Sequence, residues 1–274
     1  MFTLNCKGRL LKLDQPIVMG IINATPDSFH SDSRVDGIAE AVEKATEMLG
    51  QGASILDIGG QSTRPGSEKV GPTSEADRVV PIIQAILKQF PETIISIDTY
   101  YAEVARMSVD AGASIVNDVS GGMADANMLD IVALLKTPYI CMHHSGNALE
   151  LHQPLLSENT IKTVFDFFVE RMEACKAAGI KDLIIDPGFG FGKTLAANFE
   201  LIKDLSLLKL LAKPILLGVS RKSSIYKTLA VTADKALNGT TVVNTVGLMN
   251  GATILRVHDV KEAMEAIQLT NLMK

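Results

Sequence analysis

Seven short apolar runs along the chain stop abruptly at polar residues that can take part in chemistry. A strand buried on both faces is continuously apolar, as parallel strands covered by helices are. A polar residue just past such a run therefore lies at the rim where open α/β sheets and barrels of parallel strands bind ligands. The runs end at Asn23, Asp57, Asp98, Asn117 with Asp118, Asp186, Arg221 with Lys222, and Arg256 with His258. Their recurrence predicts one shared site.

The segments between these runs carry apolar residues at helical spacing, as in IAEAVEKATEMLGQG. About eight strand–helix units predict a (β/α)8 TIM barrel. The junctions QGAS, DAGAS and NGAT contain glycines that favour left-handed helix stops, and Ser74 is the expected N-cap of its helix. No linker divides the chain, so we expect a single domain, 1–274, with a short N-terminal hairpin at 2–13 closing the other end of the barrel. The alternative, a doubly wound open sheet, usually has a Gly-rich first turn, and NATPDSF stands there instead.

Composition and charge exclude several classes of protein. Apolar residues make up 47% of the 274 residues, enough for a well-buried core, and the net charge of −5 offers no basic surface to nucleic acid. The three cysteines are odd in number and lack ligand spacing, so we expect neither a disulfide framework nor a zinc site. No apolar stretch reaches about 18 residues, and the N-terminus lacks a signal-peptide core. We therefore expect a reduced, cytoplasmic protein without a nucleic-acid or membrane partner.

Two of the polar segments admit both a binding and a structural role. Asn23 has an amide oxygen that can ligate Mg²⁺, but NATPDSF also has the composition of a turn that leads into a helix. Thr63 and Arg64 follow two glycines and suit an anion, although Arg64 can equally pair with a nearby carboxylate. The Gly- and Pro-rich stretch after Arg64 is typical of a mobile lid.

Carboxylates and amides at the central strands need partners. Asp98 and Asn117 end neighbouring strands, and neither can cheaply remain unpaired in a dry barrel mouth. They bond either to one another and the backbone or to the donors of a ligand. For Asp57 and Asp118, a structural role that orients neighbouring groups is the alternative to substrate contact.

The segment DPGFGFGKT at 186–194 fits neither nucleotide motif. A phosphate-binding loop requires glycine where Pro187 stands, and the dinucleotide fingerprint requires it where Lys193 stands. What remains is a Gly-rich ledge that carries Phe189 and Phe191 beside Asp186. Aromatic faces next to an acidic acceptor suit a flat heterocycle with N–H donors along one edge.

Cations follow the last two strands. Lys222 begins a helix, where it is better placed to donate hydrogen bonds than to form the Schiff base of a strand-borne lysine. Arg256 and His258 surround the eighth strand, where barrels commonly bind phosphate, although His258 can also be a helix-cap neighbour without a ligand. His143 and His144 lack a third nearby ligand, so we expect no catalytic metal there.

These ordered motifs resemble those of the dihydropteroate synthases, a pterin-binding family. The shared landmarks, in family order along nearly the whole chain, are MGIINATPDSF, DIGGQSTRPG, SIDT, IVNDVSG, IIDPGFGFGK, GVSRKS and RVHDV. The resemblance implies a (β/α)8 barrel that transfers a 7,8-dihydropterin-6-ylmethyl group from its diphosphate ester to 4-aminobenzoate and releases pyrophosphate, in folate biosynthesis. It also implies Mg²⁺ as cofactor and a homodimer formed by the later helices, which the apolar stretch 236–249 permits.

The resemblance further assigns roles residue by residue. The implied pterin ligands are Asp98, Asn117, Asp186 and Lys222. The implied diphosphate ligands are Thr63, Arg64, Arg256 and His258, with Asn23 on Mg²⁺. The implied walls of the aminobenzoate slot are Pro65, Phe191 and Ser223. Arg64, Asp98, Lys222, Arg256 and His258 are then expected to be catalytic, because the reaction must stabilise a departing anion and a developing cation.

Some segments depart from the family pattern. The first loop, residues 27–36, lacks two glycines that many relatives have, Gln61 replaces a common Glu, and MHHSG replaces the usual MHMQG. Three alternatives therefore stay open. They are a pterin-dependent methyltransferase acting on a corrinoid protein, a Schiff-base aldolase using Lys222, and an inactive pterin-binding paralogue.

Overall fold

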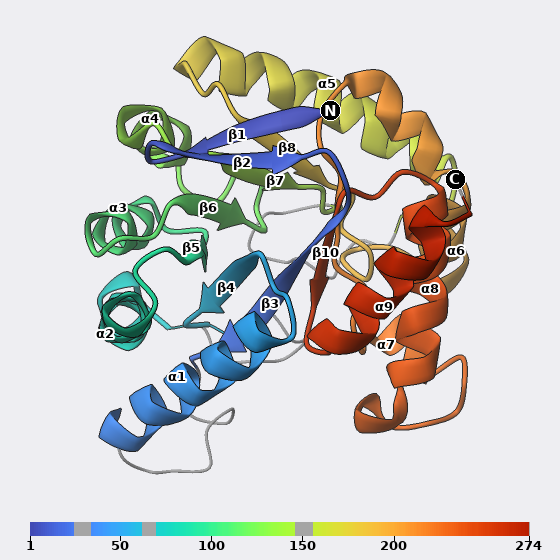
Figure 1. The fold of residues 1–274 in the computed structure, drawn as a ribbon. Helices are drawn as coiled ribbons and strands as arrows, with labels where there is room; N and C mark the ends of the chain where they lie inside the picture. The colour runs from blue at the N-terminus through green and yellow to red at the C-terminus, as the bar shows by residue number, and fades with distance from the viewer. Residues whose placement is uncertain (25–33, 62–69, 146–155, 274) are drawn as a thin grey trace.

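The computed structural model describes residues 1–24, 34–61, 70–145 and 156–273. Its centre is a sheet of eight parallel strands in the order β8-β7-β6-β5-β4-β3-β10-β9, surrounded by helices (Figure 1). The strands are β3 (Ile17–Asn23), β4 (Ile55–Gly59), β5 (Ile94–Asp98), β6 (Ile115–Asp118), β7 (Tyr139–Met142), β8 (Leu183–Asp186), β9 (Leu216–Leu217) and β10 (Ile254–Val257). Most of their residues are buried, as continuous apolar runs predict.

The sheet closes on itself between β8 and β9. Ile185 in β8 forms a parallel bridge with Ile215, directly before β9, and its backbone N–H donates to the Pro214 carbonyl at 3.0 Å. The strands therefore form a ring, and the predicted (β/α)8 barrel is confirmed.

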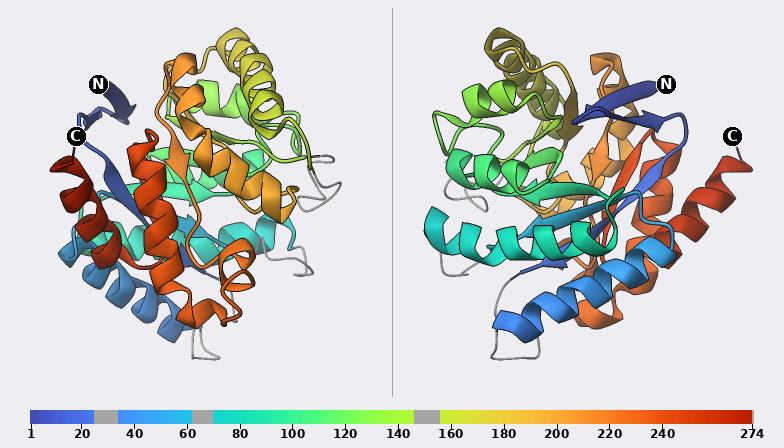
Figure 2. Two further views of the ribbon diagram at one scale, coloured as in Figure 1. Left: turned by 90° about the vertical axis from the view of Figure 1, so that its right-hand side faces the viewer. Right: turned by 60° about the vertical axis from the view of Figure 1, so that its left-hand side comes forward.

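Helices cover the outside of this ring in both views of Figure 2. They are α1 (Arg34–Gly50), α2 (Pro72–Gln89), α3 (Ala102–Asp110), α4 (Met128–Leu135), α5 (Thr160–Ala178), α6 (Leu195–Lys203), α7 (Ser223–Tyr226), α8 (Leu237–Met249) and α9 (Val260–Asn271). The expected glycine stops are confirmed, because Gly52, Gly112 and Gly251 have φ angles of 103°, 117° and 106°. The expected N-cap at Ser74 is wrong. Helix α2 begins two residues earlier, at Pro72, whose ring fixes φ near the helical value.

A hairpin of β1 (Phe2–Cys6) and β2 (Arg9–Leu13) closes one end of the barrel, as the sequence predicts. Its buried side chains Leu4, Cys6 and Leu13 pack in one cluster with residues near the starts of the strands, such as Met19 and Ile254. The opposite end, formed by the carboxyl ends of the strands, is thus the one left for a site. Within the described ranges, no helix combines the length and apolarity needed to cross a membrane.

Candidate functional site

The register of the strands brings the predicted rim residues side by side. Asn23 pairs with Gly59, Gly59 with Asp98, and Asp98 with Asn117, so the ends of four successive strands lie level. Asp186 ends β8 in register with Met142 at the end of β7. The convergence expected from the apolar runs is therefore present at the carboxyl end of the barrel.

Arg256 lies at the centre of this rim. Its Nε donates to Asp57 Oδ2 at 2.6 Å, and its Nη2 donates to Asp98 Oδ2 at 2.6 Å. Asn117 Nδ2 donates to the same Asp57 oxygen at 3.0 Å. Asp57 is fully buried and holds Arg256 and Asn117 from below, so its orienting role, left open by the sequence, is the one that the geometry favours.

Asp118 is likewise engaged by the protein. Its Oδ1 accepts hydrogen bonds from the N–H and hydroxyl of Ser120, and its Oδ2 accepts from the Gly122 N–H and the Tyr139 hydroxyl, all at 2.6–2.8 Å. These four donors saturate the carboxylate. Asp118 therefore anchors the loop after β6 and is not free to bind a ligand.

The electrostatics of the rim place Asp98 near its titration point. Burial raises the pKa of Asp98 to about 7, because the attraction of Arg256 is smaller than the desolvation cost and the repulsion of Asp57, Asp118 and Asp186 adds to that cost. The two carboxylates in turn raise the pKa of Arg256 above its usual range, against the effect of burial. Arg256 is thus a permanent cation beside a carboxyl group that changes charge near neutral pH.

Asp186 and Lys222 complete the same cluster. A Cβ placed on Gly218 would lie 3.8 Å from the Arg256 Cβ and 4.0 Å from Asp186 Oδ2, so these two side chains border one point. Asp186 Oδ1 accepts the Gly188 N–H at 2.8 Å. Lys222 Nζ donates to the Phe189 carbonyl at 2.5 Å and lies 4.3 Å from the centre of the Phe191 ring.

Burial and charge also shift the titration of these groups. Burial lowers the pKa of Lys222 to about 8, with Asp186 opposing the shift. Burial raises the pKa of Asp186, with Lys222 and the Gly188 N–H opposing. Ser223, the first residue of α7, follows Lys222 directly and is partly exposed.

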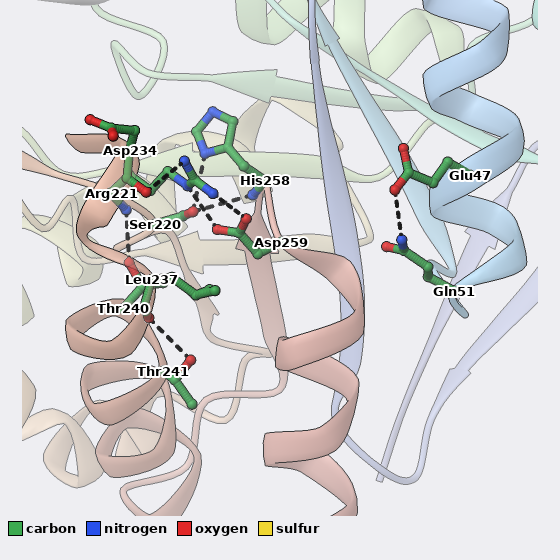
Figure 3. Close-up of polar contacts among 10 residues, drawn as sticks. All are labelled: Glu47, Gln51, Ser220, Arg221, Asp234, Leu237, Thr240, Thr241, His258 and Asp259. Carbon is green, nitrogen blue, oxygen red and sulfur yellow. Dashed lines mark hydrogen bonds and ion pairs between the residues drawn. The ribbon is translucent and has the colours of Figure 1, made fainter. Parts of the chain in front are cut away.

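His258 lies at the outer edge of the rim. It is exposed, and its Nδ1 lies 3.1 Å from the Ser220 hydroxyl, whose oxygen also accepts the His258 N–H (Figure 3). Arg221 does not share the position of Lys222. Its Nε and Nη2 make a two-point ion pair with Asp259 at 2.9 and 2.5 Å, which ties the turn before α7 to the start of α9.

Several predicted residues fall outside this description. Thr63, Arg64 and Pro65 lie outside the described residues, as does most of the first loop, 27–36. Asn23 is described and partly buried at the end of β3. Among the described residues, no group of three His, Cys, Asp or Glu side chains is placed to hold a metal ion. A single amide oxygen still suits Mg²⁺, which often keeps its waters and binds mainly through substrate phosphates.

Sequence reasoning missed Lys193 and Glu75. In the sequence, Lys193 stands out only as the residue that breaks a dinucleotide motif, yet it is buried beside Asp186. Glu75, in the first turn of α2, is also buried, and its Cγ would lie 2.9 Å from a Cβ placed on Gly60. A charged residue inside a Gly-rich loop was the available signal for Lys193. Nothing in the exposed-looking segment SEADR indicated that Glu75 is buried.

Comparison with known proteins agrees with this geometry. The model of the pterin binding enzyme family matches residues 19–258. A dihydropteroate synthase of Escherichia coli K12 is 39% identical over 265 residues, covering 96% of this chain and 93% of the relative. One from Clostridium beijerinckii is 39% identical and covers 95% of each chain. The chain therefore belongs to the pterin binding enzyme family. Within that family, it is homologous to the dihydropteroate synthases.

Solved structures give the same result. The dihydropteroate synthase of Xanthomonas albilineans with 4-aminobenzoic acid superposes with a TM-score of 0.91 at 39% identity, covering 99% of this chain and 97% of that one. The Xanthomonas albilineans synthase in complex with 7,8-dihydropteroate gives a TM-score of 0.88 at 36% identity, covering 99% and 98%. The likeness thus extends over the whole barrel.

Proposed function

We propose that this chain transfers the 7,8-dihydropterin-6-ylmethyl group from its diphosphate ester to the amine of 4-aminobenzoate, forming 7,8-dihydropteroate and pyrophosphate in folate biosynthesis. The observation that carries the proposal is the convergence of Asp98, Asp186, Lys222 and Arg256 on one part of the rim. The compounds bound to the two solved relatives are a substrate and the product of this reaction.

The buried part of the rim suits a pterin. A pterin has N–H donors along one edge and a carbonyl oxygen beside them. The carboxylates of Asp98 and Asp186 supply acceptors, Asn117 supplies an amide, and Lys222 supplies a donor. Such a site discriminates strongly, because an analogue that lacks one of the N–H groups would leave a buried carboxylate unpaired.

The cations suit the diphosphate. Arg256 is held in place by two protein carboxylates, Asp57 and Asp98. A cation held in place in advance stabilises developing negative charge without reorganisation. His258 is exposed two residues further along, where the departing anion reaches water. Thr63 and Arg64 complete the diphosphate ligands in this proposal.

The reaction needs no protein nucleophile. The bond between the pterin methylene carbon and the diphosphate oxygen breaks, and its electron pair leaves with pyrophosphate. Asp98 and Asp186 stabilise the positive charge that develops on the pterin. The amine lone pair of 4-aminobenzoate then forms the C–N bond, and the nitrogen releases a proton to water. Because an aromatic amine is a weak nucleophile, C–O cleavage runs ahead of C–N bond formation.

The aminobenzoate lies against Phe191, Pro65 and Ser223 in this proposal. The Phe191 ring, buried and already stacked under the Lys222 ammonium, offers a flat apolar wall to a benzene ring. Ser223 offers the hydroxyl and N–H at the start of α7 to the carboxylate.

Mg²⁺ is the proposed cofactor, with the amide oxygen of Asn23 as its protein ligand and the diphosphate as the remainder of its site. When bound, it supplies charge neutralisation to the leaving group. The rim fits this arrangement, because Asn23 ends β3 level with Gly59 and Asp98.

The test is incubation with the dihydropterin diphosphate, 4-aminobenzoate and Mg²⁺, following pyrophosphate and dihydropteroate. We expect stoichiometric formation of both, with loss of turnover when the amine is omitted or the metal is chelated. Pyrophosphate release without a C–N product would contradict the proposal. A parallel assay with a methyl folate and a corrinoid acceptor examines the methyltransferase alternative, for which we expect no transfer.

We further propose a single-domain cytoplasmic chain that forms a homodimer through α8. Val242, Val246 and Met249 are exposed on this helix at spacings of four and three residues, which places them on one face. We expect sedimentation to give a dimer and Val246→Glu to give a monomer. A monomeric unmodified chain would contradict this part of the proposal.

A further inference from the structure

The ammonium group of Lys193 is enclosed at the back of the candidate site. Its Nζ donates to the Gly188 carbonyl at 2.8 Å and to the Phe191 carbonyl at 3.1 Å, and it lies 2.9 Å from Nδ1 of His143. Burial lowers the pKa of Lys193 to about 7, with the attraction of Asp186 opposing. In its protonated form the group has three N–H donors, one for each of these three partners. Lys193 is 6% exposed, and the three partners that the described residues give its Nζ all belong to the protein.

Two of these acceptors belong to the loop that forms the pterin ledge. The Gly188 N–H donates to Asp186 Oδ1, while its carbonyl accepts from Lys193. The Phe191 carbonyl accepts from Lys193, while its ring lies under Lys222. Lys193 therefore holds both residues by their backbone and leaves their other groups directed at the site.

The third acceptor connects this loop to the neighbouring strand. His143 follows β7, and its backbone N–H donates to the Asp186 carbonyl at 2.8 Å. Burial lowers the pKa of His143 to about 2, with the charge of Lys193 adding to the effect, so the ring is neutral and its Nδ1 can accept. The ring of His143 thus links Lys193 to the segment that also fixes Asp186.

Among the described residues, three other side chains bond the backbone of this loop. Asp186 accepts the Gly188 N–H at 2.8 Å, and Lys222 donates to the Phe189 carbonyl at 2.5 Å. Asn198 accepts the Gly190 N–H at 2.5 Å and donates to the carbonyls of Lys193 and Thr194. This tie fixes the far side of the loop to α6. Without Lys193, the Phe191 carbonyl would lose a buried donor and the Gly188 carbonyl would keep the Phe191 N–H at 3.1 Å, so the ledge would have to rearrange for the Phe191 carbonyl to find another donor.

We propose that Lys193 is a positioning residue for the pterin site, which holds the 188–191 ledge against the end of β7 and so sets the geometry of Asp186 and Phe191. It does not touch the substrate. The inference rests on the proposed function and adds a residue to it.

The experiment compares Lys193→Met, Lys193→Ala and the matched surface control Lys203→Met with the unmodified chain. We measure the Kd of pterin-6-carboxylate by calorimetry and the KM for the dihydropterin diphosphate. Both constants should rise about 100-fold in the Lys193 variants, because a binding group displaced from its productive position costs about that factor. Both should stay unchanged in Lys203→Met. Propylammonium, which replaces the atoms missing from Lys193→Ala, should restore pterin affinity saturably, whereas tetramethylammonium should not.

The outcomes separate the two proposals. An unmodified chain without turnover would overturn the proposed function. If the unmodified chain is active, either of two results would overturn the positioning role. One is normal pterin affinity in a folded Lys193→Met variant, and the other is a Lys193→Ala variant whose pterin affinity the amine does not restore.

If neither Lys193 variant folds, a comparison of His143→Leu with His143→Gln tests the inference. The leucine should weaken pterin binding about 10-fold and the glutamine, which keeps an acceptor, should not. Equal affinities in both would overturn the inference.

Discussion

At the scale of single residues, Arg256 shows how a barrel mouth can hold a cation in place for catalysis. Its guanidinium is planar and bonds Asp57 and Asp98 through two different nitrogens, an arrangement that a lysine cannot reproduce. Asp57 is buried and also accepts from Asn117, so two of the predicted rim residues, Arg256 and Asn117, are held by one carboxylate.

Arg256→Ala should lower kcat/KM at least about 100-fold, because a preorganised group that stabilises the leaving anion is lost. Steady-state pyrophosphate release measures this. Arg106→Ala is the matched control, since Arg106 is exposed and pairs with Asp110 on its own helix. An Arg256 variant as active as this control would contradict the role assigned to Arg256.

The pH dependence of kcat/KM should be bell-shaped, with limbs near 7 and 8. Because the pKa of Asp98 is raised to about 7, this acceptor is protonated below that pH. Because the pKa of Lys222 is lowered to about 8, its ammonium group loses a proton above that pH. Lys222→Met should abolish the alkaline limb and leave the acid limb in place. A profile that is flat from pH 6 to 9 would contradict both assignments.

Glu75 should make the protein less stable at alkaline pH. Burial raises the pKa of Glu75 to about 7, with repulsion from Asp98 adding and the Thr99 hydroxyl opposing. Since this folded-state pKa lies above the unfolded value near 4.5, the stability that Glu75 contributes is present below about pH 4.5 and is lost as pH rises through about 7.

Glu75→Gln should therefore unfold with a higher free energy than the unmodified chain at pH 8.5, by up to roughly 3 kcal/mol, and with nearly equal free energy at pH 4.5. Urea unfolding at the two pH values tests this. The control is Glu47→Gln. Glu47 is an exposed glutamate on α1 that accepts a hydrogen bond from Gln51, directly after the helix (Figure 3). If the free energy of unfolding changes with pH equally in the two variants, the burial of Glu75 is not the cause of the change.

At the scale of elements, the loop between β8 and α6 is the most constrained part of the site. Gly188 has a φ angle of 67°, and a Cβ there would lie 1.8 Å from the His143 carbonyl oxygen. Side-chain-bearing residues cannot occupy this position unless the loop moves away from β7.

Gly188→Ala should therefore abolish measurable pterin binding, and should also lower the melting temperature. Gly179→Ala is a matched control, because Gly179 also has a positive φ, 96°, but nothing within 4 Å of its Cβ position. It should cost about 1 kcal/mol of stability from backbone strain and leave pterin affinity unchanged. Pterin affinities that fall equally in the two variants would refute a specific effect of Gly188.

The elements were predictable wherever one local rule decides the conformation. Buried strands are apolar throughout, and glycines with positive φ end helices, so the barrel and the rim positions follow from the sequence. The start of α2 was not predicted correctly, because Pro72 initiates it and Ser74 is not its cap. The role of Lys193 was not predictable, because it depends on the directions of two loop carbonyls that no spacing rule encodes.

At the scale of the whole molecule, the hairpin cluster that stabilises the fold and the candidate binding site lie at opposite ends of the barrel. The hairpin cluster around Leu4 lies at the starts of the strands, while Asp98 and Asp186 lie at their ends. This is the usual division in barrels of this class.

Leu4→Ala should lower the free energy of unfolding by about 2–4 kcal/mol, because it leaves a cavity under a side chain that is 2% exposed. The KM for the dihydropterin diphosphate should not change below the melting transition. Chemical denaturation and steady-state kinetics on the same preparation test this. A raised KM in the folded protein would show that the two ends are coupled.

The hairpin also affects how ligands reach the candidate site. Because Leu4, Cys6 and Leu13 cover the starts of the strands, the described residues leave the carboxyl end of the barrel as the side from which a ligand reaches the rim. On the proposed function, a pterin bound beside the buried Asn117 enters and leaves from that side. We therefore expect the pterin to bind before any ligand that lies above it, and the product to leave by the same side.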